Sequence, residues 1–382
     1  MTRTLQETRP SLPARWYYDA EHFQRELESI WYRDWVCVGR TGSLERPGEF
    51  FTAKIGSQNL IVTRGSDGGI RAWHNTCRHR GSLLCKNDTG RFRNGRIICP
   101  YHTWTYSIDG ELLSTPGRLD SSDFDTTYYS LHGAHVETWK GFIFVNLCNA
   151  PAQTLLDFLG DEKEHVANWP IEEMRSVHQE TIPVNCNWKI FWENYSECYH
   201  CPRVHPELCR IMPVYKEGVF DDADLPGWRP RFEGDGGLGR VGPDMTTWTS
   251  DGQSTLPALE GLTDREKDAG VVFMSITGSM YVVGHPDFVR SVRIRPTGPE
   301  AIELVVDWLL PKSYGQVAAD DIEHVVGLTR LVIAQDGEAC ELNQAGLHSD
   351  RFERGVLVPQ EYELWEFHEW LRRRLGCVGP DD

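Results

Sequence analysis

The chain has 382 residues, enough for two or three domains with buried cores. Its formal net charge of -17 argues against nucleic acid and anionic membrane surfaces as partners. No apolar run is long enough to span a bilayer, and residues 1–15 lack the apolar core of a signal peptide, so we expect a soluble, cytoplasmic protein. In that reducing compartment, its 11 cysteines are expected to be metal ligands and buried thiols.

The first 155 residues are predicted to hold one helix and a small β domain. Asp19 is a suitable N-cap, and residues 19–35 place apolar side chains on one helical face, so we expect an amphipathic helix there. From about residue 36 to 155, short β-rich runs alternate with turn residues, which predicts an antiparallel β domain. Its clearest runs are 59–63, 96–99 and 141–147.

The second half is predicted to combine an antiparallel sheet with surrounding helices, so the expected fold class is α+β. The strands are expected at 177–183, 271–276, 279–283, 289–295 and 302–309, and the helices at 157–168, 316–347 and 362–375. Residues 213–270 are rich in Gly, Pro and Asp, which is typical of either a mobile lid or a disordered excursion.

Two short clips of metal-ligand residues lie in the β-rich region. One clip pairs Cys77 with His79, and the other pairs Cys99 with His102. Two thiolates and two imidazoles suit either a tetrahedral zinc ion or a Rieske [2Fe–2S] cluster. A zinc finger has both cysteines in one clip, whereas mixed clips let each loop contact both irons, which favours the cluster. Structural zinc, or four unligated core residues, is the simpler alternative.

A second ligand set is predicted further along the chain. Glu193, Glu197 and His200 fall at helical spacing, opposite an aromatic face of the same helix. Pro202 should end this helix, so that the chain turns and His205 can lie beside His200. Two imidazoles and one carboxylate form a facial triad that holds ferrous iron. Two ordinary, partly buried histidines are the simpler interpretation.

The third ligand of this triad should lie far along the chain on a buried helix. Asp336 is the preferred candidate and Glu338 and Glu341 are its competitors, while a solvated helix carboxylate is the simpler interpretation of Asp336.

The residues around both sites resemble the large subunits of Rieske non-heme iron oxygenases. The resemblance is carried by Arg80-Gly81, by Pro100 to Trp104, and by Gln335-Asp336 ahead of Gln344 and Gly346. The segment between the clips is somewhat longer than most members have. The resemblance implies a [2Fe–2S] cluster on Cys77, His79, Cys99 and His102, and mononuclear Fe(II) on His200, His205 and Asp336.

The resemblance also implies a domain order and an assembly. An N-terminal helical segment (1–40) would pack on the catalytic domain (156–382), with the Rieske domain (41–155) between them. The expected assembly is a head-to-tail homotrimer. In the family, an acid at the position of Glu197 bridges an iron-ligating histidine to a Rieske histidine of the neighbouring subunit. Most members have Asp there, whereas the branch acting on carnitine and glycine betaine has Glu. A surface Glu on a wet helix face is the simpler interpretation.

Electrons are expected from a separate protein. The sequence has neither a dinucleotide-binding G-x-G-x-x-G between strand and helix nor a plant-type ferredoxin motif, so a flavin/iron–sulfur NAD(P)H reductase or a ferredoxin is the expected partner. A basic segment beside the clips is the predicted docking site, and a solvated basic loop is the alternative. Its residues are Arg78, Arg80, Lys86, Arg91, Arg93 and Arg96.

The expected reaction is O2-dependent hydroxylation of an N-methyl group of a small quaternary or tertiary amine, with release of formaldehyde. Aromatic side chains bind methylated ammonium groups by cation–π attraction, and Trp228 and Trp248 are candidates for that pocket. Hydroxylation or dihydroxylation of an aromatic acid or another ring is the alternative. A Rieske electron carrier without catalytic iron is the alternative from a different class.

Overall fold

The structure is a computed structural model that describes residues 4–219, 224–225 and 240–377. The chain divides into two compact units, one formed by residues 30–159 and the other by residues 1–29 with 160–382. The domain boundaries expected at 40/41 and 155/156 differ by a few residues from this division and remain a proposal. Within the described ranges, no helix combines the length and the apolar character needed to cross a membrane.

The smaller unit consists of a seven-stranded and a three-stranded antiparallel sheet, in the orders β2-β11-β10-β5-β4-β3-β6 and β7-β8-β9. The three runs predicted most clearly form β4, β7 and β11. The bounds are β2 (Val36–Arg40), β3 (Glu49–Ile55), β4 (Gln58–Arg64), β5 (Ile70–His74), β6 (Thr89–Arg91), β7 (Arg96–Ile98), β8 (Thr105–Ser107), β9 (Leu112–Ser114), β10 (Gly133–Trp139), β11 (Phe142–Asn146) and α2 (Leu155–Leu159).

One hydrophobic core connects these two sheets, and it contains two of the predicted ligands. Cys77 and Cys99 are buried in it together with Ile61, Trp104 and Tyr106. The first clip follows the end of β5 and the second follows the end of β7. Both clips are therefore positioned by strand ends that share one core.

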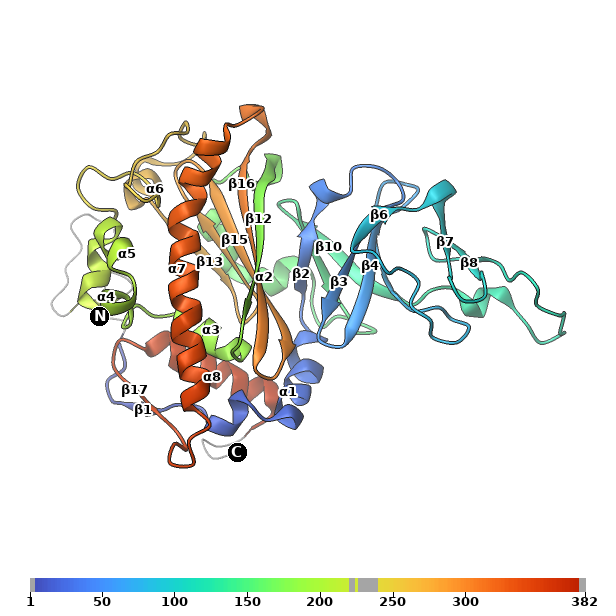
Figure 1. The fold of residues 1–382 in the computed structure, drawn as a ribbon, viewed down its shortest axis with the longest axis horizontal. Helices are drawn as coiled ribbons and strands as arrows, with labels where there is room; N and C mark the ends of the chain where they lie inside the picture. The colour runs from blue at the N-terminus through green and yellow to red at the C-terminus, as the bar shows by residue number, and fades with distance from the viewer. Residues whose placement is uncertain (1–3, 220–223, 226–239, 378–382) are drawn as a thin grey trace. The chain divides into compact units, whose positions relative to one another are not determined.

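The larger unit is built on a five-stranded antiparallel sheet in the order β12-β16-β15-β14-β13. Figure 1 shows the long helix α7 (Ala319–Gly346) along one face of this sheet. All five residues of β14 are buried, so the sheet is covered on both faces at this strand. The bounds are β12 (Met174–Val184), β13 (Val272–Ile276), β14 (Met280–Gly284), β15 (Val289–Gly298) and β16 (Ala301–Pro311). The predicted α+β class is confirmed.

The remaining helices and a small strand pair complete the larger unit. They are α1 (Ala20–Glu26), α3 (Trp188–Tyr195), α4 (Cys201–Val204), α5 (Pro206–Ile211), α6 (Asp264–Ala269), α8 (Tyr362–Leu375) and the pair β1 (Arg9–Pro10) and β17 (Val356–Leu357). The helix predicted at 157–168 is shorter than expected, because α2 ends at Leu159. Gly160 follows with a left-handed φ of +52° and opens a 3₁₀ turn.

A buried ion pair attaches α1 to α3. The side chain of Asp19 accepts the N–H of His22 at 2.7 Å, which confirms the predicted N-cap of α1. Near the other end of α1, Glu26 Oε1 lies 2.6 Å from Lys189 Nζ, and both side chains are fully buried. Removing one partner of such a pair leaves an uncompensated buried charge, which costs about 3–5 kcal/mol. The N-terminal segment is therefore an integral part of the larger unit.

Candidate metal centres

The two predicted clips have the same backbone hydrogen-bond pattern. The N–H of Cys77 and that of Cys99 each donate to the carbonyl oxygen five residues later, at 2.8 and 2.9 Å. The N–H groups of Gly81 and Thr103, four residues after each cysteine, donate back to the cysteine carbonyl oxygen at 3.0 and 3.1 Å. Gly81 and Thr103 both have left-handed φ values, +73° and +56°. The two loops are therefore equivalent turns that each present a cysteine from the first position.

The thiols and imidazoles of these loops differ in exposure. Cys77 and Cys99 are 2% and 1% exposed, whereas His79 is exposed and His102 is half-buried. The ring centroids of His79 and His102 are 4.8 Å apart, and Trp104 stacks on His79 at 4.7 Å. A buried thiol pair and a more accessible imidazole pair match the donor set of a Rieske cluster, in which the cysteines hold one iron and the histidines the other.

Tyr106 contacts the first thiol. Its hydroxyl oxygen accepts the N–H of Arg78 at 3.1 Å and lies 3.2 Å from Cys77 Sγ, so the hydroxyl proton is available to the sulfur. Burial raises the pKa of Cys77, and the Tyr106 hydrogen bond opposes that rise by stabilising the thiolate. Hydrogen bonds to sulfur are among the features that set the reduction potential of iron–sulfur clusters. Tyr106 is therefore well placed to tune a cluster held here.

Asn75 supports the first loop and was not predicted from the sequence. It is fully buried, and its Oδ1 accepts the N–H groups of Leu84 and Cys85 at 3.1 and 2.8 Å. Its Nδ2 donates to the Cys85 carbonyl oxygen at 2.9 Å. These bonds attach the chain before Cys77 to the segment after it. The only signal in the sequence is an Asn at a strand end, which also describes an ordinary turn residue.

The helix expected to run through His200 and end at Pro202 has a different structure. α3 ends at Tyr195, and the single-turn helix α4 begins after His200 with Pro202 in its first turn. The prediction that Pro202 ends a helix is wrong, because proline is also favoured at a helix start, where its missing N–H would have no partner. The expected closeness of His200 and His205 is nevertheless present, because the two residues flank α4.

Glu193 does not lie on one helix face with Glu197 and His200, as their spacing had predicted. It lies on α3 and accepts hydrogen bonds from the Tyr17 hydroxyl at 2.7 Å and from His368 Nε2 at 2.9 Å. Because α3 ends at Tyr195, residues 193 and 197 do not share one helix face. Glu193 belongs to a buried polar cluster of the larger unit, so its expected place beside His200 is wrong.

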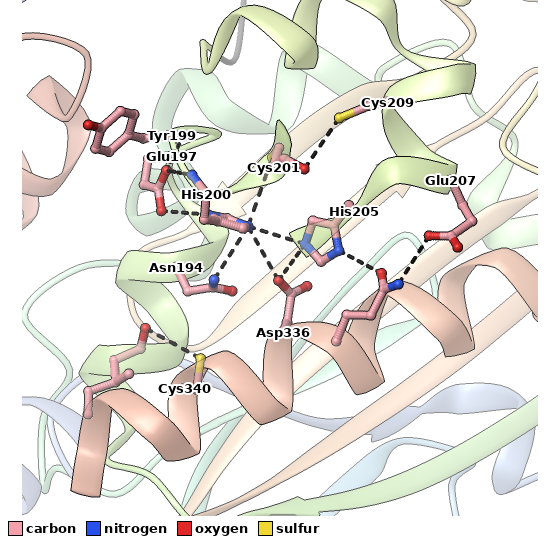
Figure 2. Close-up of polar contacts among 12 residues, drawn as sticks. Asn194, Glu197, Tyr199, His200, Cys201, His205, Glu207, Cys209, Asp336 and Cys340 are labelled. Atoms are coloured by element: carbon pink, nitrogen blue, oxygen red, sulfur yellow. Dashed lines mark hydrogen bonds and ion pairs between the residues drawn. The ribbon is translucent and has the colours of Figure 1, made fainter. Parts of the chain in front are cut away.

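His200, His205 and Asp336 converge on one point, as Figure 2 shows. The two Nε2 atoms are 3.2 Å apart, and Asp336 Oδ1 on α7 lies 2.8 Å from the Nε2 of His205 and 3.4 Å from that of His200. Among the described residues, this is the group of possible metal ligands whose donor atoms all lie within 4.8 Å of one another. Two imidazoles and one carboxylate suit Fe(II) and leave coordination positions open.

The carboxylates that competed with Asp336 lie elsewhere. Glu341 Oε1 accepts the main-chain and side-chain N–H groups of Asn185, both at 2.9 Å, and Glu338 is exposed. Asp336 is only 3% exposed. Burial acts to raise its pKa, but hydrogen bonds from the two histidines outweigh burial and lower the pKa. Asp336 is therefore the buried, ionised carboxylate of the group.

Each imidazole is oriented through its second ring nitrogen. His200 Nδ1 lies 2.6 Å from Glu197 Oε1, and His205 Nδ1 lies 2.8 Å from Gln335 Oε1. Since both partners are acceptors, the Nδ1 atoms carry the protons and the Nε2 atoms keep a lone pair for a metal. The Gln335 amide in turn donates to Glu207 at 3.1 Å, which fixes the orientation of the Gln335 side chain.

The carboxylates around the two histidines favour a cation at this point. Burial acts to lower the pKa of His200, but hydrogen bonds with Asp336, Cys201 and Glu197 raise it to about 12. The pKa of His205 is also raised against burial, chiefly by Asp336. Groups that stabilise a protonated imidazole also stabilise a metal cation in its place. The residues present therefore fit a ferrous ion.

Glu197 does not lie on a wet helix face, so that simpler interpretation is wrong. Its side chain is 10% exposed. One carboxylate oxygen contacts His200 Nδ1, and the other accepts the main-chain N–H groups of Tyr199 and His200. These bonds fix the carboxylate beside the triad.

The triad borders a cavity of about 450 Å³, a volume that includes open solvent at its mouth. Four aromatic rings form a continuous part of its wall. Trp248 makes edge-to-face contacts with Tyr215 and Phe273 at centroid distances of 6.2 and 6.0 Å, and Phe273 contacts Tyr195 at 6.2 Å. Trp248 therefore lines this cavity, and its role in binding substrate stays a prediction, whereas Trp228 lies outside the described residues.

Arg290 lines the same cavity and was missed by the sequence analysis. It lies on β15 and is 2% exposed. The alternation of the strand is the signal that identifies it. Arg290 shares a strand face with the buried residues Val292 and Ile294, whereas Arg293 and Arg295 lie on the other face. A charged residue on the apolar face of a strand is a candidate for a site.

Two family profiles match the chain over the two sites. The Rieske [2Fe-2S] domain matches residues 34–124, and the catalytic domain of the ring hydroxylating alpha subunit matches residues 171–376. The second match alone covers more than half of the chain.

Known proteins match nearly the whole length. The glycine betaine monooxygenase oxygenase subunit of Chromohalobacter salexigens is 29% identical, over 97% of this chain and 88% of that protein. The chloroplastic choline monooxygenase of Spinacia oleracea is 26% identical, over 95% and 78%. The crystal structure of the quaternary ammonium Rieske monooxygenase CntA with an inhibitor has a TM-score of 0.75 at 21% identity, over 96% of this chain and 95% of that one, and shares the fold. The chain thus belongs to the ring-hydroxylating alpha-subunit family and is the catalytic, O2-dependent subunit of a Rieske non-heme iron oxygenase.

Proposed function

We propose that this oxygenase hydroxylates an N-methyl group of a small quaternary or tertiary amine. One oxygen atom of O2 enters a C–H bond of the methyl group, and the other leaves as water with two electrons and two protons. The resulting carbinolamine then breaks its C–N bond to give formaldehyde and the demethylated amine. The observation that carries the proposal is the aromatic wall beside the triad, because a methylated ammonium group binds to such rings by cation–π attraction.

Two further observations support this substrate class. The two relatives compared above, which match nearly the whole chain, are oxygenases of glycine betaine and choline by name. Glu197 matches the acid expected for the quaternary-ammonium branch, and it lies against His200. Both observations concern the whole chain or its iron site, so they are independent of the aromatic wall.

We assign the cluster to Cys77, His79, Cys99 and His102, and the mononuclear iron to His200, His205 and Asp336. When bound, these groups supply one-electron transfer and the activation of O2. The chain itself orients the ligands, because Glu197 and Gln335 hold the protons of the two Nδ1 atoms. The aromatic wall holds the methylated nitrogen and excludes water from the cavity.

We propose a head-to-tail homotrimer in which Glu197 connects the iron site of one subunit to the cluster of the next. The exposure of His79 supports this arrangement, since an exposed imidazole is accessible to another subunit. Light scattering should give the mass of three chains. Glu197→Gln should keep cluster and iron contents while slowing oxidation of the reduced cluster by O2 and substrate. A monomeric wild type, or an unchanged oxidation rate in the variant, would contradict the proposal.

The proposed electron donor is a separate NAD(P)H-dependent reductase or ferredoxin that docks on the basic segment. Five of its residues are exposed: Arg80, Lys86, Arg91, Arg93 and Arg96. Arg78 instead donates to the carbonyl oxygens of Ser130 and Tyr128, which is a structural role. The double variant Arg91→Glu, Arg93→Glu should be reduced more slowly than wild type at low salt, and the difference should shrink as salt rises. Equal rates at low salt would contradict docking at this site.

Product analysis tests the reaction. The holoenzyme with a surrogate reductase should be given quaternary amines and aromatic acids in parallel. We expect one formaldehyde for each demethylated amine. Hydroxylated rings without formaldehyde would support the ring-hydroxylating alternative instead. A Rieske carrier without catalytic iron would contain about two irons per chain, whereas the proposed enzyme contains about three.

A further inference from the structure

We infer that Arg290 binds a carboxylate group of the substrate. The amine would then be a betaine, which carries a carboxylate as well as a methylated nitrogen, and not an alcohol such as choline. This inference rests on the proposed N-demethylation and narrows its substrate class.

The guanidinium of Arg290 is buried in the cavity wall without a counter-ion among the residues that the structure describes. Its Nη2 donates to the Tyr195 hydroxyl oxygen at 3.2 Å, and its Cζ lies 5.8 Å from the centroid of the Trp248 ring. Its Nε–H has no acceptor within the described ranges. By contrast, Arg293 on the same strand is paired with Asp307 at 3.2 Å. Because arginine keeps its charge when buried, Arg290 places a positive charge in the cavity wall.

Two more buried donors belong to residues that line this cavity. Trp248 Nε1 and Thr329 Oγ1 belong to side chains that are 4% and 1% exposed, and neither atom has a hydrogen-bond partner in the part of the chain that is described. A guanidinium and an indole N–H are donors only, and a hydroxyl can donate. An ionised carboxylate is the complementary group, because it only accepts, and hydrogen bonds between charged partners are the strong ones.

The acidic residues of the cavity already have hydrogen-bond partners and do not pair with Arg290. Asp336 contacts both histidines of the triad, and Glu197 is bonded to His200 and to main-chain N–H groups. Bringing a purely cationic substrate into this cavity places its charge near Arg290, which is repulsive. A zwitterion avoids that repulsion, since its carboxylate pairs with Arg290 while its methylated nitrogen contacts the aromatic wall.

The test compares acids with their uncharged esters. Wild-type holoenzyme with a surrogate reductase is given glycine betaine, carnitine, the methyl ester of each, and choline, and kcat/KM for formaldehyde release is measured. We expect the acids to be preferred over their esters by about 10- to 100-fold, the usual value of a hydrogen bond to a charged group. Arg290→Gln should remove this preference by lowering the activity on the acids alone. Arg290→Lys should retain part of it, because lysine keeps the charge but loses the fork of donors.

The control variant is Arg293→Gln, which lies on the same strand and is absent from the cavity lining. It should lower stability while leaving the acid-to-ester ratio unchanged. Calorimetric binding of the acids to anaerobic holoenzyme should weaken in Arg290→Gln but not in the control. If Arg290→Gln does not fold, the wild-type ratio and Arg290→Lys still decide the question.

The outcomes separate the two proposals. If the wild type uses esters or choline as well as the acids, or if the ratio survives in the Arg290 variants, Arg290 only supports Tyr195 and the inference is overturned, while N-demethylation stands. If no amine in the panel yields formaldehyde, the proposed function fails first and takes this inference with it.

Discussion

The two metal sites differ in what holds their ligands in place. In the Rieske clips the main chain does most of this, because Cys77 and Cys99 begin equivalent turns that are closed by backbone hydrogen bonds, while the Asn75 side chain joins the first turn to the segment after it. In the triad, side chains do so: Glu197 and Gln335 hold the histidine rings, and Asp336 is supplied by a distant helix. The first site should therefore be the more sensitive of the two to backbone conformation, and the second site the more sensitive to changes in the side chains that contact its ligands.

The largest effect is expected from removing the distant ligand of the triad. Asp336→Asn should abolish formaldehyde release and lower the iron content from about three to about two per chain, while the cluster absorption remains. Iron and sulfide analysis measures both contents. The matched control is Glu338→Gln, which changes an exposed acid on the same helix and should leave activity and iron intact. A third iron retained by Asp336→Asn would show that the ligand is another residue.

A smaller effect is expected from loosening one imidazole without removing it. Gln335→Ala should weaken Fe(II) binding by about 10- to 100-fold, because His205 loses the acceptor that fixes its Nδ1 proton. Titration of Fe(II) into the iron-depleted protein measures this affinity. Glu338→Gln is the control, because Glu338 is exposed on the same helix and should leave the Fe(II) affinity unchanged. Unchanged affinity in Gln335→Ala would remove the proposed contrast between the two sites.

The same contrast explains what could be predicted from the sequence. The strands of the larger unit and α8 follow from local periodicity, and α8 has the expected bounds, Tyr362–Leu375. The clip residues are close in sequence, so their mixed pairing was visible there. The end of α3 could not be predicted from the sequence, because Pro202 can either end or begin a helix and tertiary packing decides between the two.

Arg290 shows a second limit of the sequence. Strand alternation places it on the buried face of β15, but nothing local indicates that this face borders a cavity. That information depends on β15 and α7 packing into one unit, with Thr329 and Asp336 on the helix facing the same space. The burial of Arg290 was therefore detectable from the sequence, whereas the cavity beside it was not. Asn75 was missed for the same reason, since its partners are known only once the loop is folded.

Tyr106 tests whether side chains near the clips tune the cluster without holding it. Tyr106→Phe removes the hydroxyl that contacts Cys77 Sγ. Losing about 1 kcal/mol of hydrogen bonding to the reduced cluster would lower its potential by about 40 mV for a one-electron couple. The iron and sulfide contents should not change. A redox titration followed by cluster absorption measures the shift, and a raised potential, or a lost cluster, would contradict this account.

The smallest effect is expected from the two equivalent turn positions. A Cβ added at Gly81 meets no atom within 4 Å, so Gly81→Ala should cost only the left-handed conformation, about 1–2 kcal/mol of stability. Thr103 is already in the left-handed conformation and is destabilised by it. Its hydroxyl donates to the His102 carbonyl oxygen at 2.7 Å. Thr103→Gly should therefore stabilise the protein by less than about 1 kcal/mol, since the added flexibility of glycine offsets part of the relief. Urea unfolding followed by cluster absorption measures both changes. Opposite signs would support two equivalent turns held by the main chain, whereas equal destabilisation would mean that Thr103 holds its loop through its side chain.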